Sequence, residues 1–226
     1  MKRVINFLNT LKYNNNRVWF EEHKSEYKEV QSIFNSFVEK LISAISEFDP
    51  TVKEQTVKSC TYRIYRDTRF SKNKTPYKTH MGAFISPQGK NGGYSGYYFH
   101  IEAEGADYIG SHILSTGIYM PEPIVLKSIR EEISLNGQDF ESLLESAKGF
   151  SLDRSNMLKR VPNGYAADTA YSEYLKYKDF FLVKRVDDKY IEDNKLLENV
   201  IADFKKTHSF NIWMNKAVQY AYETMI

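Results

Sequence analysis

The sequence predicts an α+β fold in which a mainly antiparallel sheet is flanked by N-terminal and C-terminal helices. Three observations predict it: apolar residues at helical spacing before residue 50, alternating strand patterns joined by short turns in the centre, and helical patterns again afterwards. Short turns favour antiparallel pairing, and helices segregated from strands along the chain are typical of α+β proteins. We expect a single domain, 1–226, with a helical part at 1–50, a strand-rich core at 58–120 and a helical and mixed part at 121–226.

The N-terminal part is predicted to be helical from about residue 16 to residue 48, with a break near Ser25. Asn14–Asn16 supply short polar side chains that cap a helix, and Asp49-Pro50 ends the pattern. Apolar and aromatic residues recur at steps of one, three and four, which is the spacing of one helical face. These residues are Trp19, Phe20, His23, Tyr27, Val30, Phe34, Phe37, Leu41, Ile45 and Phe48.

Four strands are predicted in the central part, at residues 60–66, 81–86, 96–103 and 108–114. In the third strand, alternation places Tyr98, His100 and Glu102 on one face and Tyr97 and Phe99 on the other. The Gly-rich run 88–93 reads as the turn that precedes this strand.

Helices return in the last third of the sequence. Pro123 suits the first turn of a helix that runs to Leu135, and Asn136-Gly137 reads as its end. A shorter helix is expected to follow, then a strand at 180–186. The tail from about Glu192 is predicted to form two helices, with Phe204 and Trp213 as packing anchors.

Composition limits the class of protein. The single cysteine, Cys60, excludes an internal disulfide and a cysteine-based zinc site. No run approaches the ~18 apolar residues of a membrane span, and the first nine residues lack the apolar run of a signal peptide. We therefore expect a cytoplasmic protein with no membrane partner.

Positive charge is concentrated in one segment. Residues 52–90 carry nine lysines and arginines against two acids, a net charge of +7, whereas the whole chain carries +2. A segment of this kind is expected to hold an anion. Arginine forks bind phosphate or carboxylate oxygens, and lysine adds a point charge. The ligand-binding candidates within residues 63–80 are Arg63, Arg66, Arg69, Lys74, Tyr77 and Lys78. The competing interpretation is that these cations pair with acids from the rest of the chain.

Two histidines are candidates for general acid–base catalysis. His80 and His100 lie on or beside predicted strands. They would act as general acid and base groups if they faced each other across a basic cleft. With His112 and Glu102 they also offer metal-ligand side chains, but their spacing matches no metal motif, and no metal site is predicted.

Several motifs resemble one family. The central run Arg63-Ile64-Tyr65-Arg66-Asp67, with residues 69–71 and 74–78, looks like the most distinctive motif of the domain-of-unknown-function 2461 family. Residues 7–20, 96–102, 117–121, 158–165 and 173–176 are similar to its other signatures. The resemblance covers about residues 5–185, and it implies a cytosolic bacterial protein without an agreed activity. Asn73, where an acid is expected, departs from the pattern.

Three functions remain open on the sequence. The basic loop 63–80 is expected to bind an anionic ligand, either a phosphorylated small molecule or a nucleic-acid backbone with tyrosines stacking on the bases. Alternatively, the protein is an enzyme acting on a small phosphorylated or carboxylated substrate, with arginines as anion holders and His80 or His100 moving protons. Alternatively, it is a structural protein–protein interaction module whose arginines lie in internal salt bridges.

Overall fold

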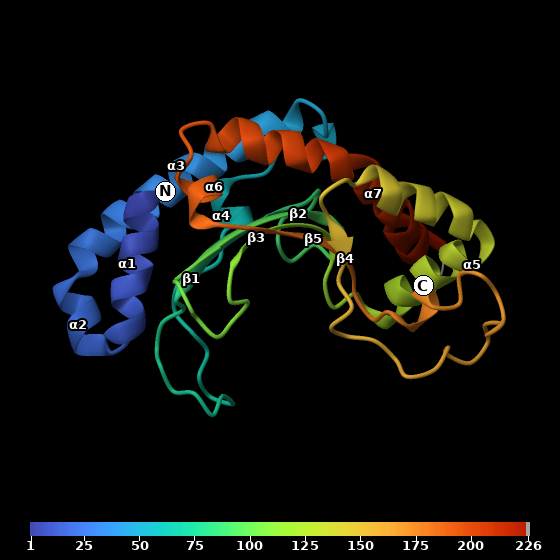
Figure 1. The fold of residues 1–226 in the computed structure, drawn as a ribbon, viewed down its shortest axis with the longest axis horizontal. Coiled ribbons are helices and arrows are strands. Elements are labelled where there is room, and N and C mark those ends of the chain that lie inside the picture. The colour runs from blue at the N-terminus through green and yellow to red at the C-terminus, as the bar shows by residue number, and fades with distance from the viewer. Residues whose placement is uncertain (225–226) are drawn as a thin grey trace.

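The computed structural model describes residues 1–224, and it confirms an antiparallel sheet flanked by N-terminal and C-terminal helices (Figure 1). The strand order is β1-β2-β3-β5-β4, and every neighbouring pair is antiparallel. The strands are β1 (His80–Ile85), β2 (Gly96–Glu102), β3 (His112–Ile118), β4 (Ser151–Leu152) and β5 (Phe180–Val186).

Helices cover one face of this sheet. They are α1 (Lys2–Tyr13), α2 (Arg17–Glu22), α3 (Lys24–Ser46), α4 (Val57–Cys60), α5 (Pro123–Ser146), α6 (Asp188–Glu192) and α7 (Leu196–Thr224), with short 3-10 turns at Pro50–Val52 and Tyr174–Lys176. In Figure 1, α3 and α7 run over the arched sheet, while long loops hang below it. We call the loop-lined side the open face.

The predicted N-terminal helices are confirmed. The side chain of Asn16 caps α2 by accepting a hydrogen bond from the amide of Trp19, and the break falls at His23. Helix α1 lies in the helical part expected at 1–50 but before the helical run predicted from residue 16, and its Val4, Phe7, Leu8 and Leu11 form a buried stripe.

The strand predicted at 60–66 is wrong. Thr56 and Ser59 form a capping box that starts the short helix α4, and the chain after it makes only isolated bridges to its neighbours. The strand predicted at 108–114 is misplaced, because residues 103–111 form a turn and β3 begins at His112.

The C-terminal part follows the prediction except at α5, at the tail and at the short strand β4, which was not predicted. Helix α5 starts at Pro123 as expected, but it continues past Asn136, which is a kink with non-helical angles rather than an end. The tail is one long helix, α7, preceded by the short α6. Phe204 is fully buried and Trp213 is partly buried against the core, so both serve as packing anchors.

The core lies between the sheet and the helices. Tyr97 and Phe99 of β2 point to this side and pack against aromatic rings of α3 and α7, whereas Leu114 and Leu182 continue the apolar layer across β3 and β5. Burying apolar surface contributes roughly 25 cal/mol per Å², which makes this layer the main stabilising element.

Among residues 1–224, no helix combines the length and apolar character needed to cross a membrane.

Candidate functional site

Four polar side chains gather on the open face of β1 and β2. The register pairs His80 with Glu102, Gly82 with His100 and Phe84 with Tyr98. Because side chains alternate along a strand, His80, Tyr98, His100 and Glu102 share this face. The predicted alternation of β2 is therefore confirmed, and the two candidate histidines are neighbours, with ring centroids 4.9 Å apart.

Tyr98, His100 and Glu102 form a continuous hydrogen-bonded chain. His100 Nδ1 lies 2.9 Å from the Tyr98 hydroxyl, and His100 Nε2 lies 3.2 Å from Glu102 Oε2. His100 is 0% exposed, and burial lowers its pKa, so the imidazole is neutral at pH 7. The neutral ring then donates a hydrogen bond from Nε2 to the carboxylate, and its Nδ1 accepts a hydrogen bond from the Tyr98 hydroxyl.

The Glu102 carboxylate also organises the turn 103–111. Burial favours a higher pKa for Glu102, but hydrogen bonds from His100 and from backbone amides outweigh it and lower the pKa. The amides of Tyr108, Ile109 and Gly110 all donate to this carboxylate, at 3.1, 3.0 and 3.1 Å. One buried charge therefore fixes both the orientation of His100 and the path of the turn.

The same turn places the Tyr108 ring over His80. The Tyr108 ring stacks on the His80 ring with centroids 4.3 Å apart and planes 14° from parallel. Burial, with the nearby His100 and the positive charge of Lys78, lowers the pKa of His80 to about 3. His80 is consequently a neutral, half-covered imidazole at physiological pH.

Lys78 and Arg63 are neighbouring cations at the edge of this cluster. Burial and the Arg63 charge both lower the pKa of Lys78, and the Lys78 ammonium lies 5.5 Å from the centroid of the Tyr62 ring. Within residues 1–224, neither cation has a carboxylate at ion-pair distance. Asp67 feels the Arg63 charge, but its close contact is with Arg69.

The other predicted cations have internal partners. Arg69 forms a forked pair with Asp67, with Nη2 2.7 Å from Oδ2, and this contact lowers the pKa of Asp67 to about 2. Arg66 braces its own loop by donating to the Thr75 carbonyl at 3.1 Å and to the Thr75 hydroxyl. Lys74 donates to the Thr68 carbonyl at 2.9 Å. These three side chains shape the loop.

Tyr77 lies in the core rather than on the loop surface. Its buried ring stacks on Phe20 with centroids 3.8 Å apart, and Asn15 holds its backbone through two hydrogen bonds. The buried Tyr77 ring has no free face on which a ligand could stack.

His112 is separated from the other histidines. It points to the helix-covered face of the sheet, where its Nε2 lies 2.8 Å from Asp188 Oδ1. Its Nδ1 accepts a hydrogen bond from the Glu102 backbone amide. No group of three or more histidine, cysteine or carboxylate side chains in residues 1–224 is arranged to hold a metal ion.

Exposed aromatic rings lie next to the cluster. These rings are Tyr62, Tyr108 and Tyr119, and neither Tyr108 nor Tyr119 was among the predicted site residues. Tyr108 was assigned to a strand, so its position over His80 had no signal in the sequence. The turn 103–111, which the Glu102 carboxylate holds in place, therefore adds to the site a residue that the sequence did not predict, Tyr108.

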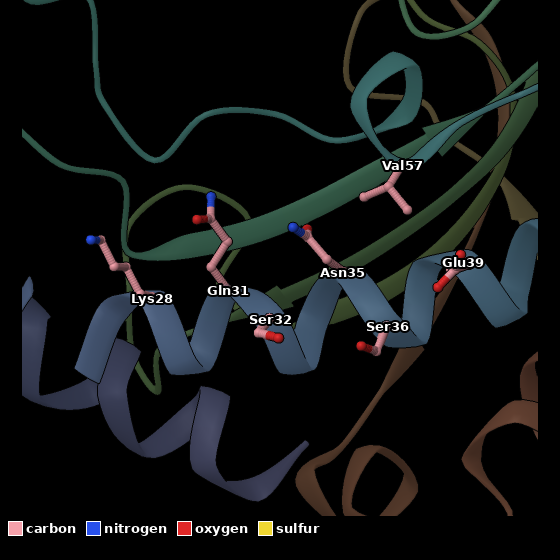
Figure 2. Close-up of a pocket in the computed structure, with 7 residues that line it drawn as sticks. All are labelled: Lys28, Gln31, Ser32, Asn35, Ser36, Glu39 and Val57. Carbon is pink, nitrogen blue, oxygen red and sulfur yellow. The ribbon is translucent and has the colours of Figure 1, made fainter. Parts of the chain in front are cut away.

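A separate hollow of about 330 Å³ lies along α3 beside Val57 of α4 (Figure 2). Among the residues of 1–224 that line it, the charged ones are Lys28 and Glu39, and Figure 2 shows them at opposite ends of the row of lining side chains. These side chains do not converge on a common point, so the open face is the better candidate site.

Comparison with known proteins places the chain in a family. The profile of the family described as "Conserved hypothetical protein (DUF2461)" matches residues 3–213. The chain belongs to the DUF2461 family. The matched residues of this DUF2461 protein include the basic loop and all the open-face residues described above. No curated protein and no solved structure matches it. The family description names no activity, so function is argued from the geometry.

Gly82 provides the space in which Tyr98 reaches His100. A Cβ atom at position 82 would lie 2.6 Å from the Tyr98 hydroxyl oxygen and 2.9 Å from the ring. We expect Gly82→Ala to displace Tyr98 and to lower the free energy of unfolding by about 1–3 kcal/mol, measured by urea denaturation. The double variant Gly82→Ala/Tyr98→Leu, which removes the clashing atoms, should recover part of this loss. An unchanged stability in Gly82→Ala would contradict the described packing.

Proposed function

We propose that this DUF2461 protein binds a phosphorylated ligand on the open face, beside Lys78 and Arg63. The observation that carries the proposal is the pair of adjacent cations without a carboxylate partner in the described residues, one of them half-buried. Keeping two like charges together away from full hydration costs free energy, and an anion between them removes that cost. Phosphate oxygens suit the combination of a guanidinium fork and an ammonium group.

The aromatic surroundings favour a ligand that carries a ring, such as a nucleotide. Tyr62 lies under the Lys78 ammonium, and Tyr108 covers His80 from the turn 103–111. Exposed tyrosine rings stack on nucleobases, and each stack contributes about 1–3 kcal/mol. A nucleic-acid backbone is the extended form of the same ligand, and its binding would depend more steeply on salt.

Acid–base catalysis is the second candidate, favoured by the Tyr98–His100–Glu102 chain. An ionised carboxylate that orients an imidazole is the arrangement enzymes use to hold a proton-transfer group. We place it second because His100 is fully buried and Tyr108 covers His80, so a substrate would reach them only after the turn 103–111 moves. Turnover of aryl phosphates or aryl esters that His80→Gln abolishes would support this function.

The experiment is a thermal-shift panel at low salt with nucleotides, sugar phosphates, coenzyme A and short oligonucleotides. A ligand present at ~100 times its dissociation constant adds ~2.7 kcal/mol to stability. For a chain of this size, that should raise the melting temperature by roughly 5–10 °C. Lys40→Ala, on the exposed side of α3, is the control and should keep the shift. A flat panel would favour the structural interaction module instead.

A further inference from the structure

We propose that a second site, between α5 and residues 162–165, binds a small monocarboxylate with an apolar body. The site is a hollow of about 550 Å³, a size typical of small-molecule pockets. It is formed by different residues from those of the open-face site. In Figure 1 the long loop between β4 and β5 runs past α5, and the Tyr165 hydroxyl on this loop donates to the Lys127 carbonyl at 3.3 Å.

One face of α5 supplies the wall of the hollow. Pro123, Lys127, Arg130 and Ser134 lie at steps of three and four, so they share one side of the helix. Pro162, Asn163, Gly164 and Tyr165 form the facing wall.

Arg130 is a buried cation in the wall of this hollow. It is only 9% exposed, and its Nη2 donates to the Tyr177 carbonyl at 2.8 Å. Its Nε is buried without a hydrogen-bond partner, and in residues 1–224 no carboxylate lies at ion-pair distance from its guanidinium. A buried cation without a counter-charge is costly, so such groups are normally paired. An anion entering the hollow would supply the missing charge.

The charge of the site selects a monoanion. Lys127 lies 3.7 Å from Glu131, and both line the hollow, so this pair largely cancels. The remaining charge is the single positive charge of Arg130. A planar carboxylate matches that charge and the planar guanidinium, whereas a phosphate dianion would exceed it and approach Glu131.

The apolar lining predicts the body of the ligand. Leu135 is 79% exposed although it is a leucine on the rim of the hollow, and Pro123 and Pro162 add apolar surface. A ring or short alkyl chain attached to the carboxylate would cover Leu135 while the carboxylate faces Arg130. Covering this surface contributes roughly 25 cal/mol per Å².

The test uses sodium benzoate and sodium hexanoate as probes, titrated into the full-length protein at constant ionic strength and followed by NMR chemical shifts. The matched neutral probes are benzamide and hexanamide, and inorganic phosphate is the anion without an apolar body. We expect saturable shifts in residues 123–135 and 162–165 with the carboxylates, and at least tenfold weaker binding of the amides and of phosphate.

Three variants distinguish the site from a structural role of Arg130. Arg130→Gln removes the charge and should abolish carboxylate binding. Leu135→Glu and Ser134→Phe, at exposed positions that leave Arg130 in place, should weaken binding at least tenfold by repulsion and by filling the hollow. Arg63→Gln, in the open-face site, should leave binding unchanged, so this site is judged apart from the proposed function. Equal binding of benzoate and benzamide, or unchanged binding in Leu135→Glu and Ser134→Phe, would overturn the proposal.

Discussion

The double variant Arg63→Gln/Lys78→Gln is expected to bind the phosphorylated ligand at least ~100-fold more weakly than the wild type. Hydrogen bonds to charged groups contribute about 1.5–3 kcal/mol each, and a factor of ten in affinity corresponds to about 1.4 kcal/mol. The fold should be retained, because neither side chain makes a hydrogen bond or ion pair within residues 1–224. Calorimetric titration with the best ligand of the thermal-shift panel measures the effect.

Arg69→Gln is the matched control for this experiment. Arg69 lies on the same loop, but its charge is already offset by the forked pair with Asp67. We therefore expect Arg69→Gln to change affinity far less than Lys78→Gln. An equal loss in both variants would indicate diffuse attraction by the whole loop, and no loss in either would contradict the site.

Stability is expected to fall steeply as the pH drops below about 6.5. The pKa of His80 is about 3 in the folded protein and near its usual value of 6.5 in the unfolded chain. Between these values the unfolded chain binds the additional proton, so acid favours unfolding. His80 alone should cost about 2 kcal/mol between pH 7.5 and pH 5. His100, whose pKa is also lowered, acts in the same direction.

The variant His80→Phe tests this assignment by urea denaturation at the two pH values. Phenylalanine keeps a ring beneath Tyr108 but takes up no proton, so the loss of stability on acidification should be smaller by about 2 kcal/mol than in the wild type. His23→Phe, at the Trp19 stack away from the open face, is the comparison variant. If both variants reduced the loss equally, His80 would not be its source.

The helical stripe and the alternation of β2 could be predicted because each follows from a regular period. The side chain of Asn16 caps α2 as the run 14–16 suggested, and Tyr98, His100 and Glu102 share a face as predicted. The strand expected at 60–66 fails because a capping box places Cys60 in α4, and the β-rich residues after it make only isolated bridges, at Thr61 and Tyr65. Local sequence alone does not decide between a helix start at Thr56 and a strand of β-rich composition.

The candidate site depends on contacts between distant segments, which limits what the sequence predicts. Tyr77 belongs to the same motif as Lys78, yet it packs on Phe20 of α2. Likewise, the role of Glu102 arises from the turn that folds back onto its carboxylate. The charge excess around residues 63–80 was visible, but which cations are paired depends on the loop conformation.

Titration of the ¹⁵N-labelled protein with pyrophosphate at low salt tests the central claim most directly. Pyrophosphate carries the phosphate chemistry without a base, and the Arg63 Nε–H and Lys78 backbone signals report on the site. We predict a saturable shift of both signals that Lys78→Gln removes and Arg69→Gln preserves. Shifts that do not saturate, or that spread equally over the exposed lysines of α3, would contradict an anion site at Lys78 and Arg63.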